Sequence, residues 1–270
     1  MDPRLETNRE YWDERVPIHV GSRFYDVDAF RRGADTLRPF EVEEVGEVAG
    51  KRLLHLQCHF GLDTLSWARR GASVVGLDFS APAVEAATGL AHESGLDGRF
   101  VASDVYAAAE ALDGERFEIV YTGLGALNWL PDVEAWARVV ASLLVEGGFL
   151  YLAEFHPITW ALGDEQMAFE RDYFHSVEGE RFEESGTYAE LDAETDHNVT
   201  REWNHTLADV IGAVLAAGLR LESFDEHDFT LFPRWAHLQR EGGLEAGEIY
   251  RQPPGSPSLP LMYSLRARRD

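Results

Sequence analysis

The stretch KRLLHLQCHFGLDTLSWARRGASVVGLDFS, residues 51–80, has the pattern of a strand, a turn, a helix and a second strand. Leu53, Leu54 and Leu56 belong to an apolar stretch that is too short for a helix and indicates a buried strand. Apolar residues then recur at helical spacing until Gly71, a residue type that commonly follows the end of a helix. The second apolar run, 74–77, stops at Asp78. We therefore predict two parallel strands joined by a helix, with a carboxylate at the end of the second strand.

This arrangement favours one class of ligand. The carboxyl ends of parallel strands open onto a common crevice, where ligands of α/β proteins bind. Gly61 in the first turn lets a ligand approach the backbone, and the helix that follows presents unpaired N–H groups to an anion. Asp78 can accept both hydroxyls of a ribose. The pattern predicts a site for a nucleoside that carries a nearby anionic group.

The segment resembles the cofactor-binding start of class I S-adenosylmethionine (SAM) methyltransferases. The first motif of that family is an acid followed by glycines at alternate positions, and these places fall here on His55, Gln57, His59 and Gly61. Only the last glycine is present. The G-x-G-x-x-G fingerprint is absent as well, which disfavours an NAD-dependent oxidoreductase. With the later motifs, the resemblance covers roughly residues 40 to 155 and extends more loosely to the end.

The resemblance implies an α/β fold with a doubly wound, mostly parallel seven-stranded sheet and an antiparallel last strand. We expect an N-terminal helical cap and the SAM-binding Rossmann-like core in residues 1–157. Residues 158–203 interrupt the α/β rhythm and are expected to form an inserted β-rich lid, and residues 204–270 the C-terminal part of the core sheet.

Within the inserted segment, the expected strands are residues 187–191 and 198–203, with a charge-rich loop as the alternative. Residues 234–239 are expected to form a short helix. Because the inserted segment leaves the rim of the sheet and is rich in aromatic and acidic residues, we expect it to close the acceptor site together with residues 11–25. A solvated loop or a dimer contact is the alternative, so the chain is expected to be a monomer or a homodimer.

The resemblance places the cofactor against the turns that follow the first four strands. The residues expected there are Gln57, Cys58, His59, Gly61, Asp78, Phe79, Ser80, Asp104, Val105, Thr122 and Gly123. Asp104 is expected to accept a hydrogen bond from the adenine amino group, with a loop-end cap as the alternative. Gln57 and His59 are expected to flank the methionine end of SAM. Cys58 also fits a small buried residue under the turn.

Methyl transfer from a sulfonium is an in-line displacement that depends mainly on orientation and the exclusion of water. A general base is needed only if the nucleophile starts protonated. The candidates for that base are Glu154, His156 and His205, and each has a structural alternative. The candidates for acceptor binding are Tyr11, Tyr25 and Trp129, with ring packing as the alternative. No zinc-ligand spacing or P-loop occurs, so no metal is expected.

The amino-acid composition limits the kinds of partner that the protein is expected to bind. The 270 residues include 48 acidic and 24 basic side chains, giving a formal charge of −24 that disfavours nucleic acids and anionic membrane surfaces. No apolar run reaches the length of a membrane helix, and the first fifteen residues contain no apolar signal region. A single cysteine fits a reducing compartment, so a cytoplasmic location is expected.

The sequence therefore predicts a SAM-dependent methyltransferase that acts on a small molecule. Two alternatives remain open at this point. One is a SAM-binding or nucleoside-binding protein without transferase activity, which formation of S-adenosylhomocysteine would exclude. The other is an NAD-dependent oxidoreductase. A comparison of SAM binding with NAD binding would distinguish it from a methyltransferase.

Overall fold

A seven-stranded sheet, in the order β3-β2-β1-β4-β5-β12-β8, forms the centre of the molecule. The computed structural model describes residues 2–174, 176–242 and 248–270. The strands of the sheet are β1 (Arg52–Leu56), β2 (Ser73–Asp78), β3 (Gly98–Ala102), β4 (Phe117–Thr122), β5 (Leu144–Phe155), β8 (Leu219–His227) and β12 (Met262–Arg269). β1 to β5 pair in parallel, whereas β12 is antiparallel to both β5 and β8. The predicted sheet, with its antiparallel last strand, is confirmed.

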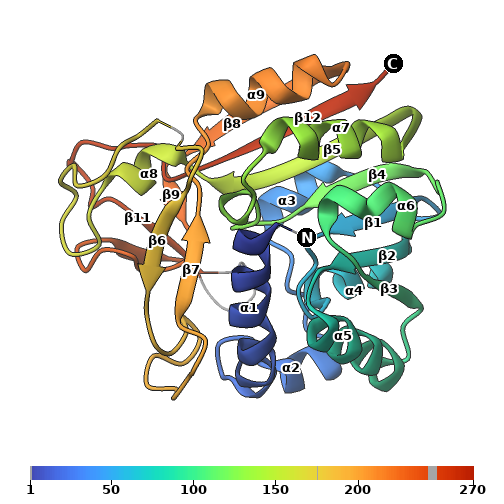
Figure 1. Ribbon diagram of the computed structural model, residues 1–270, viewed down its shortest axis with the longest axis horizontal. Helices are drawn as coiled ribbons and strands as arrows, with labels where there is room; N and C mark the ends of the chain where they lie inside the picture. The colour runs from blue at the N-terminus through green and yellow to red at the C-terminus, as the bar shows by residue number, and fades with distance from the viewer. Residues whose placement is uncertain (1, 175, 243–247) are drawn as a thin grey trace.

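Helices cover both faces of this sheet (Figure 1). They are α3 (Pro39–Val45), α4 (Leu62–Arg69), α5 (Ala81–Ser94), α6 (Ala108–Ala111), α7 (Val133–Leu143) and α9 (Leu207–Ala216). Successive residues of β1 point to opposite faces, so Leu54 packs with Trp136 of α7 while Leu53 packs with Trp67 of α4. Burial on both faces explains why the apolar runs are continuous and do not alternate.

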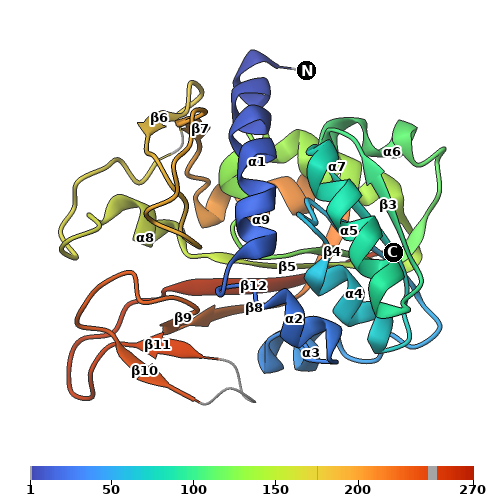
Figure 2. The same cartoon turned by 90° about the horizontal axis from the view of Figure 1, so that it is seen from below.

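Three further groups of elements lie outside the core. They are the N-terminal helices α1 (Pro3–Gly21) and α2 (Val27–Arg31), the inserted segment with α8 (Pro157–Ala161), β6 (Glu180–Glu183) and β7 (Val199–Glu202), and a small sheet of β9 (Phe229–Thr230), β10 (Gln239–Glu241) and β11 (Ile249–Arg251). In both overall views α1 stands between the core and the inserted segment (Figures 1 and 2). Within the described ranges, no helix combines the length and apolar character that crossing a bilayer requires.

Two local predictions were wrong. The strand expected at 187–191 is a turn closed by a bridge between Thr187 and Glu190, and β7 pairs instead with β6. The helix expected at 234–239 is a turn that leads into β10, which belongs to a small sheet that the sequence did not predict. In both places short strands depend on long-range pairing, and their sequences carry no clear alternation of apolar and polar residues.

Candidate functional site

The turn after β1 keeps the backbone of the glycine motif without its glycines. Gln57 and His59 have φ angles of 57° and 51°, and Gly61 has a φ of 84°. All three therefore lie in the left-handed region, which costs a non-glycine residue about 1–2 kcal/mol. The backbone of this turn therefore follows the alternating glycine pattern of the resembling family. At two of the three positions, however, Gln57 and His59 stand in place of glycine, and their backbone is strained.

Asp78, at the end of β2, fixes this turn. Its carboxylate accepts hydrogen bonds from the backbone N–H of His59 at 2.7 Å and of Ser80 at 3.0 Å. The side chain is buried, and burial raises the pKa of Asp78 to about 6. At neutral pH the group is ionised and has lone pairs left for further donors, such as ribose hydroxyls.

Glu154, at the end of β5, holds the loop that follows β4. Its two oxygens accept from the backbone N–H of Gly125 at 2.8 Å, Ala126 at 2.9 Å, Leu127 at 3.0 Å and Phe155 at 2.7 Å. Burial raises the pKa of Glu154, and these four N–H groups oppose that rise. Because four donors surround the carboxylate, the geometry favours a loop-holding role over that of a general base.

The two candidate histidines are likewise bonded to the protein. His156 Nε2 lies 3.0 Å from the Glu226 carboxylate, and its Nδ1 accepts from the N–H of Ile158 at 3.1 Å. Burial lowers the pKa of His156 despite that carboxylate. His205 Nε2 lies 2.7 Å from the carbonyl of Leu130. These contacts fit the structural alternatives for both residues.

The remaining cofactor candidates line the same edge of the sheet. Asp104 accepts from the N–H of Tyr106 at 3.0 Å, and so caps a short 3-10 helix, η1 (Val105–Ala107). It also borders a cavity of about 590 Å³ that lies beside the start of α1. Cys58 is buried, as expected. Gln57 Oε1 and Thr122 Oγ1 are buried and have no hydrogen-bond partner among the described residues, so this edge offers acceptors to a ligand that carries N–H donors.

An aromatic cluster joins the turn after β1 to α1 and the inserted segment. It consists of Tyr11, Trp12, His19, Tyr25, His59, Trp129 and Tyr188. Trp12 lies at its centre, with ring centroids 5.4 Å from His59 and 5.1 Å from Trp129. Tyr11 stacks on Trp129 at 6.0 Å, and the hydroxyls of Tyr25 and Tyr188 are hydrogen-bonded. The three residues predicted for acceptor binding therefore belong to one cluster.

His19 links the two halves of this cluster. Its Nδ1 lies 3.3 Å from Nε2 of His59, and its Nε2 contacts the hydroxyl of Thr187 in the inserted segment. Burial, together with nearby Arg15, lowers the pKa of His19 to about 4, and burial holds the pKa of His59 well below its usual range. Both imidazoles are therefore uncharged at neutral pH.

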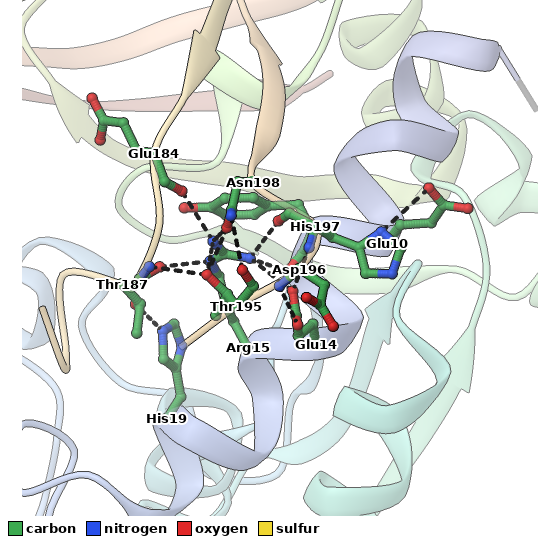
Figure 3. A network of polar contacts seen from close by, with 12 residues as sticks. Glu10, Glu14, Arg15, His19, Glu184, Thr187, Thr195, Asp196, His197 and Asn198 are labelled. Atoms are coloured by element: carbon green, nitrogen blue, oxygen red, sulfur yellow. Dashed lines mark hydrogen bonds and ion pairs between the residues drawn. The ribbon is translucent and has the colours of Figure 1, made fainter. Parts of the chain in front are cut away.

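Arg15 fastens α1 to the inserted segment (Figure 3). The side chain is fully buried and donates to the carbonyls of Gly186 at 3.0 Å and His197 at 2.8 Å, and to Asn198 Oδ1 at 3.2 Å. Its guanidinium also stacks 3.3 Å from the centre of the Tyr11 ring. The guanidinium also donates to the carbonyl of Glu184 and to the hydroxyl of Thr195. Most of its N–H donors are therefore bonded to one stretch of the inserted segment.

Asn8 makes a second connection, and sequence reasoning missed both. Its side-chain amide donates to the carbonyl of Arg201 at 2.7 Å and accepts from the N–H of Arg201 at 2.8 Å. Asn8 thus satisfies both backbone groups of this β7 residue, in the way that a paired strand would. Asn8 and Arg15 share the buried face of α1 with Leu5 and His19. Their spacing of three to seven residues matches one helix face, and this periodicity is the signal that could have identified them.

Comparisons with known proteins show which family part of this chain resembles. Residues 54–150 match the family described as “Methyltransferase domain”. A ubiquinone biosynthesis O-methyltransferase of Xanthomonas euvesicatoria pv. vesicatoria is 33% identical over 148 residues, or 53% of this chain and 61% of that protein. The protein of the same name from Brucella anthropi is 32% identical over 134 residues, or 50% of each chain. The chain therefore spans less than two thirds of the length of these relatives.

Solved structures share the fold. A SAM-dependent methyltransferase from Mesorhizobium loti covers 88% of this chain and 100% of its own, with a TM-score of 0.57 and 23% identity. A second from Clostridium acetobutylicum covers 91% and 96%, with a TM-score of 0.59 and 14% identity. Sheet order, the turn after β1 and the matched residues define a class I methyltransferase fold. Residues 54–150 are similar to a methyltransferase domain, and the solved structures that share the fold are SAM-dependent methyltransferases.

Proposed function

We propose that this protein transfers a methyl group from SAM to a small-molecule acceptor held in the aromatic cluster. One observation carries the proposal: His59 belongs both to the turn that bonds Asp78 and to the ring cluster with Trp12 and His19. The expected cofactor site and the expected acceptor site thus share a wall. SAM supplies a methyl group on a positively charged sulfur, and the chain supplies binding, orientation and exclusion of water.

The chemistry of the cluster favours an acceptor that is neutral or positively charged. Both imidazoles are uncharged at neutral pH, and the guanidinium of Arg15 is bonded to the inserted segment. An anionic acceptor would therefore lack a cation to pair with, whereas ring faces attract apolar molecules and cations. The test is incubation with methyl-labelled SAM and panels of phenols, amines, thiols and carboxylic acids. We expect labelled product, and S-adenosylhomocysteine, from the first three panels only.

A SAM-binding protein without transferase activity is the second candidate. The observation that favours it is that Glu154, His156 and His205 all make hydrogen bonds within the protein. Transfer to a nucleophile that is already unprotonated needs no base, so these contacts do not decide the matter. Tight binding of SAM with no methyl transfer to any panel would favour the binding protein.

Asp78 provides a prediction for the cofactor site. Asp78→Ala should weaken the binding of S-adenosylhomocysteine by about 1–3 kcal/mol, because ribose hydroxyls lose their acceptor. Since the pKa of Asp78 is about 6 and the ionised form is the better acceptor, affinity should fall as the pH drops through 6. Asp78→Asn should remove this pH dependence. Calorimetry between pH 5 and pH 8 measures both effects, with Asp97→Ala, an exposed acid, as control. Equal affinity of Asp78→Ala and the wild type would contradict the assignment.

Tyr188 provides a prediction for the acceptor site. Its hydroxyl bonds to Tyr25, and its ring lies 4.9 Å from that of His19. Tyr188→Ala should raise the KM of the acceptor about tenfold, equivalent to about 1.4 kcal/mol, and leave the affinity for S-adenosylhomocysteine within about twofold. Leu191→Ala, at a side chain 79% exposed in the same segment, is the matched control. An unchanged KM in the Tyr188 variant would show that this part of the inserted segment does not contribute to the acceptor site.

A further inference from the structure

Glu202, the last residue of β7, is a half-buried acid with no role in the site described above. Side chains alternate between the two faces of a strand, so Glu202 shares a face with the buried Thr200. Thr200 Oγ1 donates to Glu202 Oε1 at 3.0 Å, and the side-chain amide of Asn128 donates to Oε2 at 3.0 Å. These two bonds fix the orientation of the carboxylate, and each oxygen keeps a lone pair for a further donor.

The protein provides no cation that balances this carboxylate. Residues 2–174, 176–242 and 248–270 contain no ion-pair partner of Glu202, and the charges that act on it most strongly belong to Glu184 and Glu180. Glu180 of β6 lies directly opposite Glu202 in the ladder, which is unfavourable for like charges, and is itself paired with Arg171 at 3.7 Å. Burial raises the pKa of Glu202, and the two acids add to that rise. A partly buried carboxylate without a cation is costly to the fold, so its charge is expected to serve binding.

Glu202 lies beside the aromatic cluster that is proposed to hold the acceptor. Its donor Asn128 directly precedes Trp129 in the short 3-10 helix η2 (Leu127–Trp129). Burial raises the pKa of Tyr11 and the negative charge of Glu202 adds to that rise, so the carboxylate is close to the ring that stacks on Trp129. Aromatic rings and an unbalanced carboxylate therefore adjoin, a combination that suits an ammonium group on an apolar body.

We propose that Glu202 pairs with a positively charged amino group of the acceptor and so selects amine-bearing molecules as substrates. The rings would hold the apolar body of the acceptor, and the carboxylate would accept a charge-assisted hydrogen bond from its ammonium group. Glu202 acts here in recognition and orientation, and no bond of the methyl transfer changes at its oxygens. The inference rests on the proposed function and narrows its acceptor from neutral or cationic molecules to those that carry an ammonium group.

The experiment measures the binding of paired probes that have the same shape but differ in charge. Tyramine and tryptamine carry an ammonium group at neutral pH, whereas 4-propylphenol and 3-propylindole have a methyl group in its place. In calorimetry with protein saturated with S-adenosylhomocysteine, we expect the wild type to bind at least one amine about tenfold or more tightly than its uncharged counterpart. Glu202→Gln, which keeps the size of the side chain and removes the charge, should abolish that difference.

Two further variants separate a direct ion pair from the overall charge of the protein. Glu202→Asp keeps the charge on a shorter side chain and should retain part of the preference for amines. Glu183→Gln removes an exposed carboxylate from β6, in the same small sheet, and should retain all of it. Each variant should bind S-adenosylhomocysteine within about twofold of the wild type, which also verifies that it is folded.

Two results would overturn the proposal. One is a wild type that binds neither amine more tightly than its uncharged counterpart. The other is a preference that persists in Glu202→Gln or is lost equally in Glu183→Gln, because it would then come from the negative charge of the whole protein. A preference lost only in Glu202→Gln, combined with no methyl transfer to any panel, would support the amine site and contradict the proposed transferase activity.

Discussion

Replacing Arg15 with alanine should lower the free energy of unfolding by about 3–5 kcal/mol, because the substitution leaves several buried acceptors without a donor. The guanidinium bonds the carbonyls of Gly186 and His197 and the amide of Asn198, and it fills the space over the Tyr11 ring. Lysine cannot reproduce this planar fork, so Arg15→Lys should recover only part of the loss. Chemical denaturation measures the change.

Arg31 offers the matched control. It pairs with Asp28 and Glu93 at the surface, where its side chain is 40% exposed, so Arg31→Ala should cost less than about 1 kcal/mol. Hydrogen exchange adds a local measurement, since residues 184–198 should exchange faster in Arg15→Ala and remain protected in Arg31→Ala. If Arg15→Ala matched the control in both measurements, Arg15 would not be what fastens α1 to the inserted segment.

Glu154→Ala should be almost as destabilising, by about 3–5 kcal/mol, and should also weaken the binding of S-adenosylhomocysteine at least about tenfold. The substitution leaves the N–H groups of Gly125, Ala126 and Leu127 without an acceptor inside the protein. The loop after β4 would loosen, and Gln57 would lose the rigid carbonyl to which it is bonded. Denaturation and calorimetry on the same sample link the two effects.

A second buried acid serves as the comparison. Glu41 accepts from the Tyr121 hydroxyl and from the N–H of Arg38, and burial raises its pKa to about 7. Because the folded state holds this proton more tightly than the unfolded state, stability should decline between about pH 4.5 and pH 7 in the wild type. Glu41→Gln should remove that contribution and leave cofactor binding intact. Equal losses of ligand affinity in the Glu41 and Glu154 variants would contradict a specific role for the loop.

The central sheet could be predicted because its signals are local. The three leucines of β1, the glycine after α4 and the acid that ends β2 each follow from short-range rules. Ser80 caps α5, and Gly95 follows it with a left-handed backbone. These features all lie between residues 52 and 95, and each depends on its near neighbours in sequence, so no tertiary information was needed to place them.

The accessory parts could be predicted only in outline. β6 consists of Glu180, Arg181, Phe182 and Glu183, which do not alternate as a half-buried strand should, and its pairing depends on β7. The aromatic residues of α1 suggested a cap, yet the partners of Arg15 lie in another part of the sequence. The roles of Glu154 and Gln57 also depend on a loop whose position only the fold provides.

The contacts of α1 have a consequence for how the chain assembles. Arg15 and Asn8 bond to residues 171 and 193 positions later in the sequence. The contacts of α1 are therefore completed only by residues that are synthesised after all five core strands β1 to β5. Closing so long a loop is entropically costly and slow compared with local pairing. Until those residues have been made, Arg15 and the aromatic side chains of α1 remain exposed to water. We therefore expect α1 to dock against the inserted segment late in folding.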